Sequence, residues 1–82
     1  MSWFVYMAQC SDGTLYTGCT NHVDKRIAKH NSGKGAKYTS RRLPVHLVYS
    51  TPVANRSEAQ KLEYRIKQLS RAEKQKLIRE GK

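Results

Sequence analysis

The sequence predicts one small α+β domain, in which a small three-stranded antiparallel sheet is flanked by helices in the order β-β-α-β-α-α. Three observations lead to this fold class. Residues 3–10 and 14–20 are runs rich in apolar, aromatic or β-branched residues on either side of a glycine turn, which is typical of a hairpin. Two helix-start patterns follow in the second half of the chain. Because 82 residues suffice for one core and no more, we expect a single domain over residues 1–82.

The turn of the hairpin determines which side chains share a face of the sheet. A two-residue Asp-Gly turn would place Tyr6 and Tyr16 on opposite faces. A three-residue loop is instead a type I turn with Gly13 left-handed, and it pairs Tyr6 with Gly18. It also pairs Ala8 with Tyr16, so these four residues share one face. We predict this second register, in which Gly18 leaves an open patch opposite Tyr6 that a phosphate backbone could approach.

The middle of the chain is predicted to form a helix, a flexible basic loop and the third strand. Thr20 or Asn21 can cap the start of the helix. The helix is predicted to run to about Asn31, and Gly33 can end it. The loop follows, and the third strand is predicted at about residues 45–50.

Two capping boxes predict the last two helices. Ser57 with Gln60 opens a helix that is predicted to reach about residue 69. Ser70 with Glu73 restarts the chain as a second, shorter helix that is predicted to reach about residue 79. These helices complete the predicted order of elements and supply apolar stripes to cover the sheet.

The charge balance points to a polyanionic partner. Sixteen Lys and Arg residues oppose six Asp and Glu residues, a net charge of +10. The charge is concentrated, most informatively around residues 32–38, where glycines, lysines and one tyrosine alternate in a predicted loop. A solvated basic surface that only keeps the protein soluble is the alternative interpretation. The candidate nucleic-acid-binding residues are Gly18, Lys34, Lys37, Tyr38, Arg41 and Arg42.

Several classes of protein are excluded by composition. No apolar stretch approaches the roughly 20 residues of a membrane span, and no secretion signal is visible. Cys10 and Cys19 are therefore expected to be reduced thiols in a cytoplasmic protein. They lack the companion ligands of a structural zinc site. No motif for a nucleotide or another small-molecule cofactor is present. The expected partner is nucleic acid, most simply DNA, and the oligomeric state stays open.

Arg26 and His30 are four residues apart and therefore adjacent on one side of the predicted helix. Val23 and Ile27 form the apolar stripe beside them, which puts the pair at the edge of the packed face. An arginine there can grip a phosphate, and a histidine can accept or relay a proton. The alternative is an ordinary solvent-exposed basic helix.

Glu63 lies on the margin of an apolar helical stripe that includes Ala59 and Ile66. A carboxylate at this margin is unusual in a chain with so few acidic residues. Mg²⁺ would explain it, since this ion needs few protein ligands and keeps several waters. The alternative is an ion pair, either with a neighbour on the helix or with Arg26.

Taken in order, these residues resemble the GIY-YIG nuclease domain over about residues 3–78. The resemblance is closest to the small single-domain bacterial proteins of the YhbQ-like group. Phe4 and Thr17 differ from the glycine and isoleucine of the family name, and Thr17 points away from the Tyr6 face in the predicted register. The strings that carry the resemblance are Val5-Tyr6, Asp12-Gly13, Tyr16-Thr17-Gly18, Arg26 with His30, Gly33-Lys34-Gly35-Ala36-Lys37-Tyr38, Glu63 and Leu69-Ser70-Arg71.

The resemblance implies phosphodiester hydrolysis with one divalent metal, Mg²⁺ or Mn²⁺, held by Glu63. Arg26 would neutralise charge on the phosphate. Tyr6 would deprotonate the attacking water, helped by His30 and Tyr16, although the residues do not decide which tyrosine is the base. A tyrosine base requires a pKa depressed by nearby cations.

The expected function is that of a metal-dependent endonuclease acting on DNA, in repair or recombination. No base-reading motif is visible, so we expect a preference for single-stranded or branched DNA over a sequence preference. RNA stays open as a substrate. The alternatives are a non-catalytic nucleic-acid-binding accessory module and a small scaffold protein whose charge is incidental.

Overall fold

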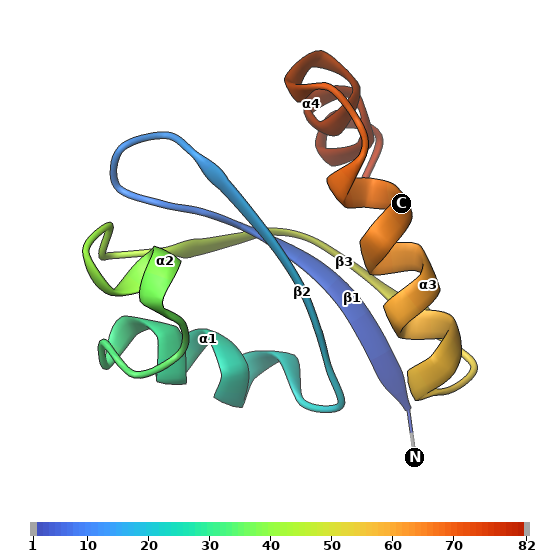
Figure 1. The fold of residues 1–82 in the computed structure, drawn as a ribbon, viewed down its shortest axis with the longest axis horizontal. Coiled ribbons are helices and arrows are strands. Elements are labelled where there is room, and N and C mark those ends of the chain that lie inside the picture. The colour runs from blue at the N-terminus through green and yellow to red at the C-terminus, as the bar shows by residue number, and fades with distance from the viewer. Residues whose placement is uncertain (1, 82) are drawn as a thin grey trace.

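A computed structural model describes residues 2–81, and it has three layers (Figure 1). The central sheet has the strand order β2-β1-β3, with α1 and α2 on one side and α3 and α4 on the other. The predicted fold class and element order are confirmed, with one short helix added in the basic loop. The elements are β1 (Trp3–Gln9), β2 (Leu15–Thr20), α1 (Val23–Asn31), α2 (Lys37–Ser40), β3 (His46–Val53), α3 (Arg56–Lys67) and α4 (Arg71–Glu80).

The hairpin has the predicted three-residue loop and register. Gly13 has a φ of 87°, and its amide donates to the carbonyl of Cys10 at 2.9 Å. Tyr6 pairs with Gly18 across the antiparallel strands, and Ala8 pairs with Tyr16. The two tyrosines therefore share one face, as the turn chemistry predicts.

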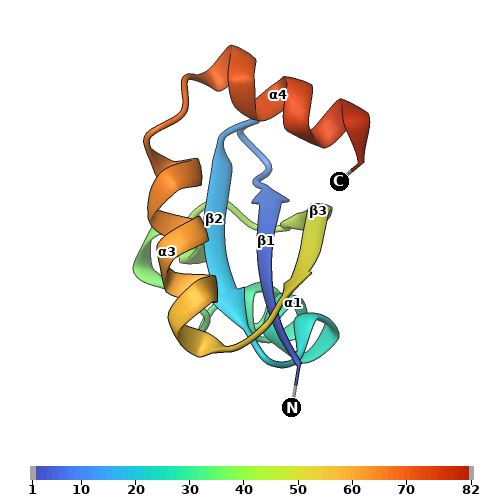
Figure 2. The ribbon, with the colours of Figure 1, turned by 90° about the vertical axis from the view of Figure 1, so that its right-hand side faces the viewer.

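Each face of the sheet has its own apolar core. Val5 and Met7 of β1 face α3, where they pack with Ala59 and Ile66. Tyr6 and Ala8 face the opposite way and pack with Val45, with Ile27 of α1 beside them. Figure 2 shows the strands side by side, with α3 next to β2 and α4 across one end of the sheet. Since β2 is an edge strand, groups from both layers can meet around its free edge.

Two predicted helix starts are wrong by one to two residues. His22, rather than Thr20 or Asn21, is the N-cap of α1. Asn55 caps α3 by accepting from the amide of Glu58 at 2.9 Å, so the predicted capping box at Ser57 does not form. Asparagine is one of the strongest N-cap residues, and its earlier position makes Ser57 part of the first turn. The capping box of Ser70 and Glu73 at the start of α4 is confirmed.

The third strand extends past its predicted end at residue 50. Thr51 and Val53 continue the pairing with β1, and Pro52 lies between them. Proline is tolerated here because β3 is an edge strand and one side of its backbone is unpaired. No helix within residues 2–81 combines the length and the apolar character needed to cross a membrane. Cys10 is buried, Cys19 is half-buried, and both are free thiols.

Candidate active site

Tyr6 of β1 and His30 of α1 form a hydrogen-bonded pair inside the protein. Both side chains are fully buried, and Tyr6 Oη lies 2.7 Å from His30 Nε2. The other ring nitrogen, Nδ1, lies 2.9 Å from Thr39 Oγ1, which α2 contributes. The sequence placed His30 at the edge of the packed face. The structure corrects this, because α2 folds back over the ring and satisfies its second nitrogen.

The hydrogen-bond network defines the tautomer of His30. The hydroxyl of Thr39 donates its single proton to the carbonyl of Ala36 at 3.2 Å, so its oxygen must accept from His30 Nδ1–H. In the neutral ring Nε2 is then an acceptor, and the hydroxyl of Tyr6 donates to it. Burial, and after it the positive charge of Arg26, lowers the pKa of His30, which favours this neutral form.

The surroundings of Tyr6 raise its pKa rather than lower it. Burial is the largest cause and outweighs the hydrogen bond and the charge of Arg26, so the pKa of Tyr6 rises to about 12. The negative charge of Glu63 also contributes to the rise. Arg26 alone therefore does not depress the pKa of Tyr6, because its charge and hydrogen bond are outweighed by loss of solvent.

Arg26 is held at two of its guanidinium nitrogens. Nε donates to Tyr6 Oη at 3.4 Å, and Nη2 donates to the carbonyl of Gly35 at 3.0 Å. The bond to Tyr6 is the first cause of a raised pKa of Arg26, and Tyr16 contributes further. The guanidinium thus lies beside both tyrosines, in a fixed orientation that suits bidentate recognition of a phosphate.

The Tyr6–His30 pair packs so closely against Gly18 and Gly35 that neither position has room for a side chain. A Cβ on Gly18 would lie 2.7 Å from Tyr6 Oη and 2.8 Å from its Cζ. A Cβ on Gly35 would lie 2.5 Å from His30 Nδ1. The predicted open patch at Gly18 is therefore wrong, since the tyrosine ring itself fills that space and Gly18 is buried. The close approach that these glycines permit is made by the chain's own side chains.

Tyr16 links the buried pair to the surface. Its ring centroid lies 5.0 Å from that of His30 and 6.4 Å from that of Tyr6. On the other side, the ring centroid of Tyr38 is 6.1 Å away. Tyr16 is half-buried, so the aromatic cluster runs from the core to solvent at the β2 edge.

Glu63 comes from α3, in the opposite layer. Its Oε2 lies 2.7 Å from Lys67 Nζ, one helical turn further on. Burial, and then Glu63, raise the pKa of Cys19 on β2 to about 11, so this carboxylate lies against the edge strand. One of the two predicted ion-pair alternatives, a partner on the same helix, is thus present. Lys67 is not among the residues predicted from the sequence, although its spacing of four from Glu63 was a usable signal.

A single carboxylate fits Mg²⁺ or Mn²⁺ better than a softer metal. Within residues 2–81 no group of three or more His, Cys, Asp or Glu side chains gathers into a metal site. Mg²⁺ keeps most of its waters and is commonly held by one or two carboxylates together with substrate phosphate oxygens. Glu63 meets that requirement as a hard oxygen donor that is mostly but not fully buried, with 21% of its side chain exposed.

The candidate nucleic-acid-binding residues are in different environments. Lys34, Lys37 and Arg41 are exposed on the basic loop and α2. Arg42 instead bonds Asp12 at 3.1 Å, and its guanidinium lies 4.1 Å from the ring centroid of Tyr38. Arg42 therefore holds Tyr38 in place and ties α2 to the hairpin turn. A role for these residues in binding nucleic acid stays a prediction.

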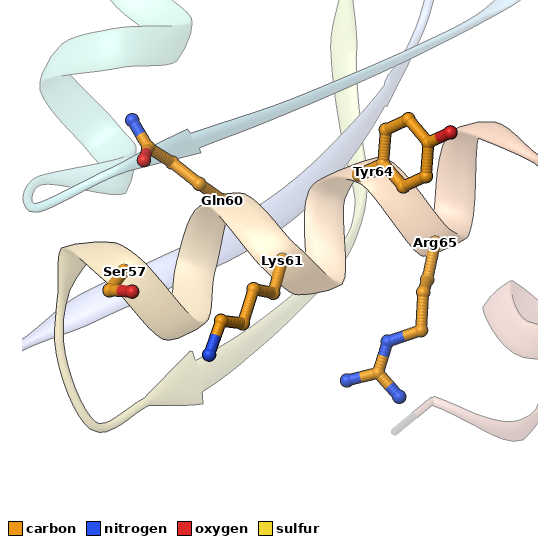
Figure 3. A pocket seen from close by; sticks show the side chains of 5 residues that line it. All are labelled: Ser57, Gln60, Lys61, Tyr64 and Arg65. Carbon is orange, nitrogen blue, oxygen red and sulfur yellow. The ribbon is translucent and has the colours of Figure 1, made fainter.

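A second feature of α3 lies apart from this cluster. An open groove of about 540 Å³ runs along α3. Figure 3 shows that two of its lining side chains, Lys61 and Arg65, point to the same side. None of the predicted site residues lines it. Its lining residues are Ser57, Gln60, Lys61, Tyr64 and Arg65.

Known proteins resemble this chain over most of its length. The model of the GIY-YIG catalytic domain matches residues 2–77. A UPF0213 protein of Desulfotalea psychrophila is 56% identical over 79 residues, covering 95% of this chain and 72% of that protein. A UPF0213 protein of Staphylococcus epidermidis is 54% identical over 78 residues, covering 95% of each chain.

Solved structures agree with these sequence matches. The solution NMR structure of a UPF0213 protein from Bacillus halodurans has 49% identity and a TM-score of 0.60, covering 95% of this chain and 83% of that one. A solution NMR structure of a protein from E. faecalis has 38% identity and a TM-score of 0.65, covering 96% and 84%. The chain therefore belongs to the GIY-YIG catalytic domain family, among the small bacterial proteins named UPF0213.

Proposed function

We propose that this protein is a metal-dependent endonuclease that hydrolyses phosphodiester bonds of DNA. The observation that carries the proposal is the hydrogen-bonded network of Tyr6, His30 and Arg26, which lies close enough to Glu63 for the carboxylate charge to act on Tyr6. A buried tyrosine, a neutral histidine and an oriented arginine beside one carboxylate provide the parts needed for phosphoryl chemistry.

In this proposal each residue has a separate task. Arg26 binds the scissile phosphate and balances its developing charge, since its guanidinium is held in place at Nε and Nη2. Glu63 holds Mg²⁺ or Mn²⁺, which when bound supplies Lewis-acid stabilisation of the phosphate and the leaving oxygen. Lys67 must give up its contact with Oε2 of Glu63 for this to happen.

The tyrosines have different roles. Tyr6 is fully buried, so its hydroxyl cannot meet bulk water, and it acts as a positioning residue that orients Arg26. Its proton is directed to Nε2 of His30, which keeps the Tyr6 oxygen lone pairs turned toward Arg26. Tyr16 borders an open pocket, so we assign to its hydroxyl oxygen the contact with the attacking water.

A nuclease assay tests this proposal. End-labelled single-stranded, duplex and branched DNA are incubated with the protein at low salt, with Mg²⁺, Mn²⁺ or EDTA. We expect metal-dependent cleavage that favours single-stranded or branched DNA, as suits a role in repair or recombination, and that Glu63→Ala abolishes. Glu58→Ala is the matched control, because it removes another carboxylate of α3 that pairs with a lysine on the same helix, Lys61.

A non-catalytic nucleic-acid-binding module is the second candidate function. The Glu63–Lys67 ion pair favours it, since a neutralised carboxylate does not repel a phosphate backbone. Binding without cleavage in both wild type and Glu63→Ala would support this candidate and exclude the nuclease for the DNA substrates tested. Cleavage that Glu63→Ala and Glu58→Ala reduce equally would also contradict the proposed role of Glu63.

A further inference from the structure

A second pocket lies at the free edge of β2, directly beside the aromatic cluster. Its volume is about 280 Å³, and four elements contribute to it. β2 supplies its floor residues, α2 supplies an aromatic ring, and α3 and α4 each supply one lysine. The lining residues are Leu15, Tyr16, Thr17, Tyr38, Lys67 and Lys74.

We propose that this pocket binds one unstacked nucleotide of a DNA single strand, with the base against Tyr38 and Leu15 and its phosphate between Lys67 and Lys74. The inference rests on the proposed function, and it deepens that function by naming the state of the strand that the site accepts. The shared residue is Tyr16, which belongs to both the pocket and the aromatic cluster. The pocket nucleotide would therefore neighbour the scissile phosphate.

The aromatic wall is rigid before any ligand arrives. Tyr38 is 40% exposed, and the guanidinium of Arg42 packs over its ring. Arg42 is itself held by Asp12 at 3.1 Å and by the carbonyl of Tyr38 at 2.6 Å. Arg42 covers one face of the ring, so a base would pack on the part of the ring that stays exposed, and base stacking on aromatic side chains is the usual mode of single-strand binding.

A polar group in the pocket wall also lacks a partner. Thr17 is 4% exposed, and its Oγ1 is buried without a hydrogen-bond partner among residues 2–81. This hydroxyl lies on the face of β2 that is turned toward Met7 and α3, so Thr17 forms part of the pocket wall and is not a contact for a base packed on Tyr38.

The charges on the opposite wall fit the phosphate of the same nucleotide. Lys74 forms no ion pair with any described residue. Lys67 is paired with Glu63, so one ammonium group of the pocket is free and the second is shared with the candidate metal ligand. An aromatic and apolar wall facing two lysines matches a base and its phosphate.

The size of the pocket favours one base over a base pair. Its volume of about 280 Å³ lies just below the roughly 300–1,000 Å³ that is typical of sites for drug-sized ligands. A base within a duplex would have to leave its stack to enter, whereas a single strand presents unstacked bases already. The groove of α3 in Figure 3 also has a tyrosine and two basic side chains, but none of its lining residues belongs to the aromatic cluster.

The test measures binding in EDTA, so that cleavage does not enter. Fluorescence anisotropy is recorded for a labelled single-stranded 12-mer and for a duplex of the same sequence. Tyr38→Leu keeps an apolar side chain but removes the ring, and it should weaken single-strand binding by at least about fivefold with little effect on the duplex. Lys74→Ala should also weaken single-strand binding. Lys76 is an exposed lysine of the same helix outside this pocket, so Lys76→Ala should leave single-strand binding unchanged.

The outcomes separate the pocket from the nuclease activity. The proposal would be overturned if Lys74→Ala and Lys76→Ala lost single-strand affinity equally. It would also be overturned if Tyr38→Leu weakened single-strand and duplex binding equally. Thermal melting of each variant verifies its fold, and ¹⁵N chemical-shift mapping of wild type with the 12-mer provides a test without mutation. Shifts centred on Thr17 and Lys74 support the pocket, and shifts confined to the α3 groove overturn it. Absence of cleavage alongside the expected binding pattern would refute only the nuclease.

Discussion

The hydroxyl of Tyr6 lies 2.7 Å from Nε2 of His30, with both side chains fully buried in the layer between the sheet and α1. The bond joins residues 24 positions apart in the chain. It also determines where Arg26 lies, since the same tyrosine oxygen accepts from the arginine Nε. A single buried contact therefore connects the stability of the fold to the geometry of the candidate site.

Removal of the Tyr6 hydroxyl should lower both the stability of the fold and the nuclease activity. Tyr6→Phe leaves Nε2 of His30 buried without a donor, which costs about 1–3 kcal/mol of unfolding free energy. Arg26 also loses its Nε acceptor, so nuclease activity should fall by at least about tenfold. Urea unfolding and the cleavage assay measure the two effects. Tyr49→Phe is the comparison: it removes the hydroxyl of a tyrosine in the opposite core and should leave the activity of the folded protein unchanged.

Gly18 should tolerate no side chain. In Gly18→Ala the new Cβ would lie 2.8 Å from Cζ of Tyr6, so the ring must move and its contact with Arg26 must change. We expect a lower melting temperature and loss of cleavage at temperatures where the variant is still folded. Gly33→Ala is the comparison, because it strains a backbone with a φ of 85° yet meets only one side-chain atom, at 4.0 Å. Full activity in folded Gly18→Ala would contradict the positioning role of Tyr6.

Acid should destabilise the protein through His30. Burial lowers its folded pKa below the ordinary value of 6.5, so the unfolded chain binds more protons as pH falls past 6.5. Stability is therefore complete above that pH and declines toward pH 5, by at most about 1.4 kcal/mol per pH unit for one proton. Urea unfolding between pH 5 and pH 8 measures the slope. His30→Gln should flatten it, and an equal slope in wild type and variant would show that other groups cause the decline.

Lys67 should compete with the metal for Glu63. Lys67→Ala frees Oε2 of the carboxylate, so affinity for Mn²⁺ should rise by about two- to fivefold, as expected for loss of a partly exposed ion pair. Mn²⁺ electron paramagnetic resonance measures free metal directly and needs no turnover. Lys61→Ala breaks the equivalent pair with Glu58 and should leave Mn²⁺ affinity unchanged. If the affinity for Mn²⁺ rises in neither variant, the metal does not bind at Glu63.

Much of the fold could be predicted because local chemistry dominates it. The three-residue loop with a left-handed Gly13 determined the hairpin register, and with it the shared face of Tyr6 and Tyr16. The capping box of Ser70 and Glu73 likewise determined the start of α4. The prediction for α3 was wrong at its start because two caps compete there, and Asn55 comes first in the chain.

The amino-acid sequence by itself determined the order of elements, the hairpin register, the concentration of positive charge and the family to which the chain belongs. Only the tertiary structure decided the burial of His30 under α2, the filling of the Gly18 space by Tyr6 and the pairing of Glu63 with Lys67. The physical reason is the distance along the chain between the residues that interact. Turns and caps depend on neighbours a few residues away, whereas burial and pKa depend on which distant segments pack together.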